Sequence, residues 1–240
     1  MVRRKFLPVM RALLLGKNPF VWLARTLRTK GPWRVAQILW QALLDLSWDI
    51  VHGTETLKRI RPHLIETESG NKGQATYYGA TRARPLVHLL REVNLPLDGG
   101  FVDLGCGKGR VLLIAAEHGF RLVTGVDFSE PLCETARRNL AAFQRGRTLN
   151  AEVSVIHCDV VDYVIRPDDT VFFLYDPFHA KVLASVLDGL RQSLKASPRT
   201  LWLIYNSPRL HDVVQQSGLF SACRQFEIGG NEFSVYQTNG

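Results

Sequence analysis

Cysteine is scarce in this chain, and its cysteines show no pairing. The 240 residues contain four of them, at Cys106, Cys133, Cys158 and Cys223. Their spacing matches neither a metal site nor the framework of a small disulfide-rich secreted domain. We therefore expect no bound metal and a reducing compartment, as in a cytoplasmic protein.

Long apolar runs without charge are missing as well. Basic residues interrupt the N-terminal region, so no stretch approaches the roughly 18 apolar residues that a membrane span requires. No small-residue cleavage site follows a clean apolar segment, as it would in a secretory signal. The sequence thus predicts neither a spanning helix nor a signal peptide, and we find no internal repeat.

Acidic residues are absent before Asp45, where nine basic residues occur. The rest of the chain holds 21 basic and 22 acidic residues, so the net charge of +8 belongs to the N-terminal region. Trp33, Trp40 and many leucines lie among these bases. Four interpretations stay open: an interfacial helix on an anionic membrane, a mitochondrial presequence if the protein is eukaryotic, a face for nucleic acid or a partner, or helices packed on the next domain.

The length accommodates one α/β domain with an extension. We divide the chain into a basic amphipathic helical extension (residues 1–52), a loop or lid segment (53–81) and an α/β domain (82–240). A helix is expected at residues 82–93, directly before the first strand of that domain.

The most informative segment runs from Phe101 to Arg110, with the sequence FVDLGCGKGR. An apolar strand ends at Asp103, three glycines follow at alternate positions, and an apolar helix begins at once. Glycine lets the backbone turn sharply near a ligand, and the helix start offers free N–H groups. The pattern predicts a nucleotide-cofactor site at the carboxyl end of a first strand, although a tight turn without a ligand is the alternative.

Two further apolar segments are followed by acids. Residues 121–127 predict a second strand that ends at Asp127, and residues 152–157 predict a third, followed by Asp159. An acid at the end of the second strand is placed to accept the ribose hydroxyls of an adenosine cofactor. Alternatively, Asp127 caps the helix that begins near Ser129, and Asp159 is a solvated loop acid.

The remaining segments continue the alternation of strands and helices. A buried strand at 170–175 ends in Asp176-Pro177-Phe178. We expect a helix at 179–195, a strand at 199–206, a helix at 209–216, and two strands at 220–228 and 232–237 that form a hairpin around two glycines.

In this order the motifs resemble those of the class I S-adenosylmethionine (SAM) methyltransferases. The D-x-G-x-G pattern is similar to their motif I, whereas Arg110 occupies the third glycine position of a dinucleotide fingerprint and disfavours a nicotinamide enzyme. The resemblance covers roughly residues 77–237. It implies a Rossmann-like seven-stranded α/β sheet, mostly parallel, with a C-terminal antiparallel hairpin and helices on both faces.

The resemblance also implies roles for individual residues. SAM would be the cofactor, and the residues expected to bind it are Asp103, Gly105, Cys106, Gly107, Gly109, Asp127, Phe128 and Asp159. Asp103 would order the loop, Asp127 would hold the ribose and Asp159 the adenine. Cys106 is interpreted as a small residue, not a nucleophile.

Asp176-Pro177-Phe178 resembles motif IV of amino-group methyltransferases. Asp176 would orient the acceptor nitrogen, Pro177 would fix the turn and Phe178 would form an apolar wall beside the methyl group. That motif usually has a second proline, which is missing here. Tyr77 and Tyr78 are candidates for a lid over the substrate.

The expected activity is therefore methyl transfer from SAM to a nitrogen, with protein lysine as the leading acceptor. A small molecule or RNA is the alternative acceptor, although the near-neutral α/β domain does not favour nucleic acid. A non-catalytic SAM-binding protein at a membrane is a further alternative. The expected location is the cytoplasm, either free or peripheral at a membrane.

Overall fold

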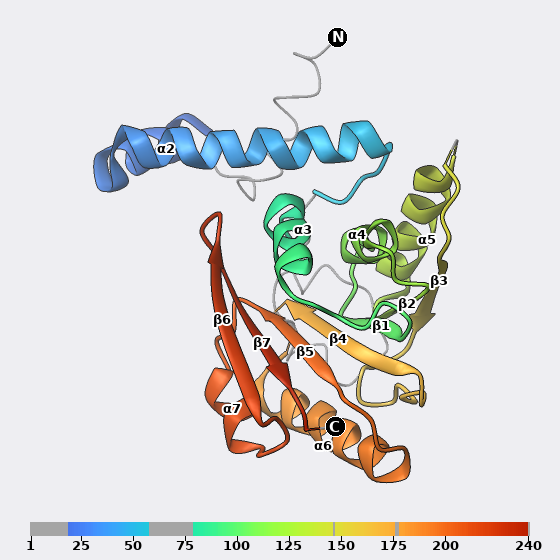
Figure 1. Ribbon diagram of the computed structural model, residues 1–240. Helices are drawn as coiled ribbons and strands as arrows, with labels where there is room; N and C mark the ends of the chain where they lie inside the picture. Colours follow the sequence, from blue (N-terminus) through green and yellow to red (C-terminus); the bar gives the residue numbers. More distant parts are fainter. Residues whose placement is uncertain (1–18, 58–78, 146, 176–177, 240) are drawn as a thin grey trace.

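Seven strands form one sheet in the described part of the chain, which comprises residues 19–57, 79–145, 147–175 and 178–239 (Figure 1). The strands are β1 (Gly100–Leu104), β2 (Leu122–Asp127), β3 (Glu152–His157), β4 (Asp169–Tyr175), β5 (Trp202–Asn206), β6 (Ala222–Ile228) and β7 (Asn231–Gln237). Their order across the sheet is β3-β2-β1-β4-β5-β7-β6. Strands β1 to β5 pair in parallel, while β7 is antiparallel to both β5 and β6. The predicted Rossmann-like sheet with a C-terminal hairpin is confirmed.

Helices cover both faces of this sheet, as expected (Figure 1). They are α2 (Pro19–His52), α3 (Ala83–Glu92), α4 (Arg110–His118), α5 (Glu130–Gln144), α6 (Ala180–Ala196) and α7 (His211–Gln216). Helices α3, α4 and α5 lie on one face, and α6 and α7 lie on the other. The parallel strands are therefore covered on both sides, which explains why they are apolar throughout.

The core consists of two apolar clusters separated by the sheet. Alternate residues of each strand point to opposite faces. Phe101 and Phe173 accordingly pack with α3 and α4, whereas Val102 and Phe172 pack with α6.

Helix α2 lies outside these layers, across α3 and α4 (Figure 1). It contains a kink at Gly31, whose φ of 76° and ψ of 166° are not helical. Glycine adopts a positive φ without strain, and the following Pro32 cannot donate a helical hydrogen bond, so the two residues together account for the kink. No described helix is long and apolar enough to cross a membrane.

Candidate active site

The glycine-rich turn between β1 and α4 is fastened to the end of β2. The backbone N–H groups of Gly105 and Cys106 both donate to the carbonyl oxygen of Val126, at 2.8 and 3.0 Å. Gly105, Gly107 and Gly109 have φ values of 86°, 53° and 80°. These values lie in the left-handed region that side chains disfavour, so the turn requires its glycines.

Asp127 is the acid at the centre of this turn. Its Oδ2 accepts the Gly107 N–H at 2.8 Å, and its Oδ1 accepts the Ser129 N–H at 3.0 Å. The side chain is buried, and burial raises the pKa of Asp127 to about 6. Asp127 therefore holds both the glycine turn and the start of α5. The Ser129 hydroxyl is buried and has no hydrogen-bond partner among the described residues, so it does not cap the helix.

Asp103 is a second buried acid, on β1. Burial, together with the neighbouring negative charge of Asp127, raises the pKa of Asp103 well above its usual value. The two carboxyl groups therefore lie in a region that disfavours negative charge, directly beside the glycine turn.

Cys106 is buried within the turn. Burial and the two nearby acids raise the pKa of its thiol well above the usual value. Cys106 therefore stays a neutral thiol at physiological pH, which argues against a nucleophilic role because the thiolate is the reactive form.

Gly125 is a requirement of the turn that our sequence analysis missed. A Cβ atom at this position would lie 2.6 Å from Leu112 Cδ1 and 2.8 Å from Cys106 Sγ. The absence of a side chain on β2 thus lets the turn and α4 pack against the sheet. A lone glycine inside an apolar strand is the signal that would have indicated such a close approach.

The other predicted cofactor residues lie at the ends of β2 and β3. Phe128 follows Asp127 directly, and its carbonyl oxygen is 3.1 Å from His157 Nε2. Asp159 is half-buried, and its Oδ1 accepts the Val161 N–H at 3.2 Å in the turn after β3. The adenine-binding role of Asp159 stays a prediction.

The predicted substrate residues are only partly within the described chain. Phe178 is buried among the apolar residues that pack with α6, on the opposite face of the sheet from Phe101. Its role as a wall beside the methyl group stays a prediction. Tyr77, Tyr78, Asp176 and Pro177 lie outside the described residues.

Comparisons with known proteins agree with this geometry. A family model described as "Methyltransferase domain" matches residues 101–197, a range that begins in β1 and ends just after α6. Residues 101–197 are a methyltransferase domain. The matched range supplies strands β1 to β4, and β5, β7 and β6 complete a seven-stranded sheet of the class I arrangement. The cofactor of that class is SAM.

Curated relatives match this domain over a limited length. The chain is 30% identical over 92 residues to the putative methyltransferase YqeM of Bacillus subtilis, covering 33% of this chain and 37% of that protein. It is also 30% identical over 82 residues to the mouse EEF1A lysine methyltransferase 2, covering 34% of this chain and 30% of that protein. The chain thus spans about a third of the length of these relatives.

A solved structure supports the fold but not the function. The PH0226 protein of Pyrococcus horikoshii superposes with a TM-score of 0.50 at 20% identity, covering 66% of this chain and 90% of that one. At this identity the likeness concerns the architecture alone.

The residues of the methyltransferase domain fit SAM. Each carboxylate oxygen of Asp127 accepts one backbone N–H, whereas an ionised carboxylate has about four acceptor sites. The described residues therefore leave two sites for a ribose diol, which supplies two O–H donors. The left-handed glycines leave the backbone of the turn without side chains, so that a ligand can approach it closely.

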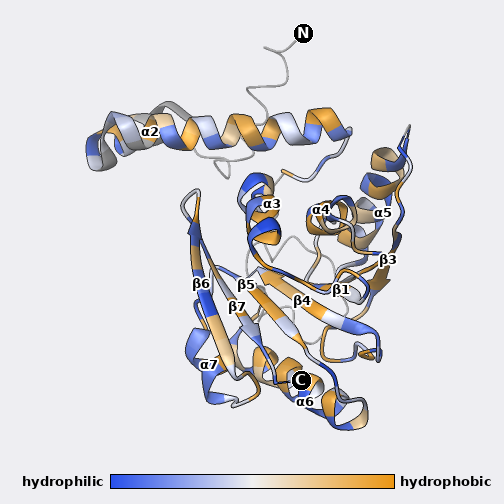
Figure 2. Ribbon diagram, viewed as in Figure 1, coloured by the Kyte–Doolittle hydropathy of each residue, from blue (hydrophilic) through white to orange (hydrophobic). Residues whose placement is uncertain are grey.

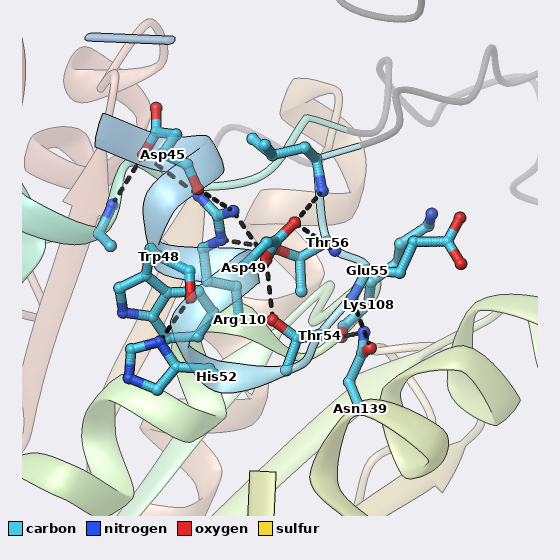
Figure 3. Close-up of polar contacts among 12 residues, drawn as sticks. Asp45, Trp48, Asp49, His52, Thr54, Glu55, Thr56, Lys108, Arg110 and Asn139 are labelled. Carbon is cyan, nitrogen blue, oxygen red and sulfur yellow. Dashed lines mark hydrogen bonds and ion pairs between the residues drawn. The ribbon is translucent and has the colours of Figure 1, made fainter. Parts of the chain in front are cut away.

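Arg110, the first residue of α4, joins the domain to α2 (Figure 3). Its buried guanidinium contacts Asp45 Oδ1 at 3.2 Å and Asp49 Oδ1 at 3.1 Å, and it lies 5.0 Å from the centre of the Trp48 ring. Arg110 Nε also donates to the Thr56 hydroxyl at 2.6 Å. These contacts fix α2 against the residue that directly follows the glycine turn.

Asn139 on α5 supports the turn from the other side (Figure 3). Its amide nitrogen donates to the carbonyl oxygen of Lys108 at 2.9 Å, and its amide oxygen accepts the Glu55 N–H at 2.8 Å. No local sequence pattern indicates the Arg110 and Asn139 contacts, because the partners are between 31 and 84 residues apart along the chain.

Asn206, the last residue of β5, is another polar residue that our sequence analysis missed. It is buried, and neither its amide nitrogen nor its amide oxygen has a hydrogen-bond partner among the described residues. It pairs in register with Tyr175 at the end of β4, and Ser207 after it has a φ of 55°. A buried amide with unused hydrogen-bonding capacity at this edge is suited to contact a polar ligand. The sign in the sequence is an asparagine directly after an apolar strand.

Proposed function

We propose that this protein transfers a methyl group from SAM to a nitrogen atom, with protein lysine as the leading acceptor. The observation that carries the proposal is the buried Asp127 carboxylate beside the glycine turn, inside a methyltransferase domain. The match to the mouse EEF1A lysine methyltransferase 2 supports a protein acceptor, although it covers only 34% of this chain. The resemblance of Asp176-Pro177-Phe178 to motif IV supports a nitrogen acceptor.

In this proposal the chain positions the two reactants. SAM supplies a methyl group on a sulfonium, activated for in-line displacement. Asp127 holds the ribose, and the glycine turn admits the methionine part close to the backbone. The lysine ammonium would first lose a proton to water, since only the neutral amine has a lone pair. Asp176 would accept hydrogen bonds from this amine and direct its lone pair at the methyl group, so that the C–N bond forms as the C–S bond breaks and S-adenosylhomocysteine leaves.

Calorimetric titration with SAM, S-adenosylhomocysteine and NAD tests the cofactor. We expect one SAM and one S-adenosylhomocysteine to bind per chain, and no NAD. The D127N variant should bind SAM about tenfold or more weakly, because it loses charge-assisted hydrogen bonds to the ribose. D98N is the matched control, since Asp98 is exposed at the opposite edge of the sheet. Binding of NAD, or of none of the three, would contradict the proposal.

Transfer of radiolabelled methyl groups from SAM to a cell lysate tests the acceptor. We expect label in protein, recovered after hydrolysis as methyl-lysine, and a large loss of label with D176N. D168N is the control, because Asp168 lies before β4, at the far end of that strand. Label in RNA or in small molecules would refute the protein acceptor while leaving SAM as the donor.

Asn206 offers a second test of where the acceptor lies. If its free amide contacts the acceptor, N206A should raise the KM for the acceptor or lower kcat while the Kd for SAM stays unchanged. An equal loss of SAM affinity would show that the variant disturbs the fold of the site instead.

A further inference from the structure

The second half of α2, residues 32–52, has two faces of opposite character. Its inner face carries Asp45 and Asp49, and both are paired with the buried Arg110. Its outer face carries apolar side chains that are open to solvent. We call these the outer stripe: Trp33, Trp40, Leu43, Ile50 and Val51. A surface helix normally buries its apolar face and exposes its charges, so this arrangement is inverted.

The outer stripe is continuous along the helix. Its members follow one another at helical spacings, which places them within one sector of the surface. Trp33 is 82% exposed, Trp40 59% and Ile50 63%. Every exposed side chain described between Trp33 and Val51 is uncharged. Figure 2 shows the apolar residues recurring along this part of α2.

The surroundings of the stripe are basic. Arg25 and Arg28 are exposed on the first part of α2, before the kink at Gly31. The sequence holds nine basic residues and no acid before Asp45. The groove between α2 and α3 is lined by Trp48, by Arg84 and Arg91, and by one acid, Glu92. Positive charge thus accompanies exposed tryptophan and aliphatic side chains.

We propose that α2 is a docking surface for an anionic phospholipid bilayer, on which it lies in the plane of the membrane. Tryptophan favours the boundary between headgroups and acyl chains, and basic residues attract anionic headgroups. The outer stripe inserts at that boundary while Arg25 and Arg28 contact the headgroups. The inner face meanwhile stays bound to Arg110, so the methyltransferase domain is held at the membrane with its glycine turn adjacent to the docked helix.

Co-sedimentation of the full chain with phospholipid vesicles tests this surface. We expect binding to vesicles that contain phosphatidylglycerol, weaker binding to pure phosphatidylcholine, and a decline with rising salt, because the attraction is screened. W33S/W40S should reduce the bound fraction about tenfold or more, since two apolar side chains no longer leave water. R25S/R28S should reduce it several-fold on anionic vesicles alone.

V164S is the matched control for the tryptophan variant. Val164 is also 82% exposed, but it lies between β3 and β4, away from α2, so its vesicle binding should equal that of the unaltered protein. SAM binding should be unchanged in all variants, since none of these side chains contacts the glycine turn. Equal sedimentation of the unaltered protein and W33S/W40S overturns the proposal. The proposal is also overturned if analytical ultracentrifugation shows a concentration-dependent dimer that W33S/W40S abolishes. The outer stripe would then bind a second copy of the chain.

Discussion

Two pairs of acids, one on α2 and one on the sheet, differ in the positive charge that lies beside them; three of the four acids are buried, and Asp45 is partly buried. Asp45 and Asp49 on α2 share the guanidinium of Arg110. Asp103 and Asp127 on the sheet face the glycine turn, and no arginine or lysine is among the causes that shift their pKa values. The first pair is a structural clamp, whereas Asp127 of the second pair keeps acceptor sites that no described residue uses.

The pKa values follow this difference. Burial raises the pKa of Asp45, but the adjacent Arg110 acts in the opposite direction. Burial alone dominates at Asp103 and Asp127, and the nearest charge on Asp103 is the other acid. Retaining two acids in such a place costs stability, which is a sign of function.

Removing the guanidinium from the clamp should have the largest effect. R110M removes the guanidinium that pairs with buried Asp49 and partly buried Asp45, and we expect a loss of about 3–5 kcal/mol in the free energy of unfolding. R110K keeps the charge but not the two-pronged geometry, so its loss should be smaller. Urea denaturation measures both. R137M is the control, because the Arg137–Glu130 pair is exposed and such pairs contribute about 1 kcal/mol or less. Equal effects of R110M and R137M would refute the clamp.

The free energy of unfolding should depend on pH through Asp127. The folded pKa of Asp127 is about 6, above its ordinary value of 3.8, so the folded protein binds more protons than the unfolded chain between these pH values. The stability from this group is present below about pH 4 and is lost as pH rises through 6, by about 3 kcal/mol. D127N should lack that decline when unfolding is measured from pH 4 to 7. An identical profile in D127N would show that Asp127 does not titrate in this range.

Binding of SAM should have the opposite pH dependence. A ribose diol donates to an ionised carboxylate, so protonation of Asp127 below about pH 6 should weaken SAM binding. The Kd for SAM should then rise by up to about tenfold for each pH unit below 6. D127N should bind weakly at every pH. Calorimetry in the same series of buffers measures this, and a SAM affinity independent of pH would argue against the ribose contact.

Adding a side chain at Gly125, where β2 packs against the glycine turn, should lower stability by an intermediate amount. In G125A the new methyl group meets Leu112 and Cys106, and we expect a loss of about 1–3 kcal/mol from overpacking together with weaker SAM binding. G189A is the control. Gly189 lies within α6, and a Cβ atom there would have Ile165 Cδ1 as its nearest neighbour, at 3.7 Å. That variant should be neutral or up to about 1 kcal/mol more stable, since alanine favours helices.

A loss of similar size should follow from removing the Asn139 link between the glycine turn and the segment after α2. N139A leaves the Lys108 carbonyl and the Glu55 N–H without their partner, and we expect a loss of about 1–3 kcal/mol. If the link positions the turn, SAM affinity should fall as well. Unchanged affinity in a folded N139A would show that the link stabilises the fold without serving the site.

The sequence by itself determined the order of strands and helices and the place of the glycine turn. Apolar runs of strand length, glycines at alternate positions and acids at strand ends are local signals, and the sheet formed where they predicted it. Asp103 and Asp127 were found in this way because parallel strands bring their carboxyl ends to one edge.

Only the tertiary structure decided how the N-terminal region and the core meet. Arg110 and its two acids are 61 and 65 residues apart, and no local pattern distinguishes a buried arginine from an exposed one. Likewise, the sequence showed that α2 is basic and rich in tryptophan, but not which side chains the domain would cover. That depends on packing between distant segments, which buried the charges of the second half of α2 and left its tryptophans outside.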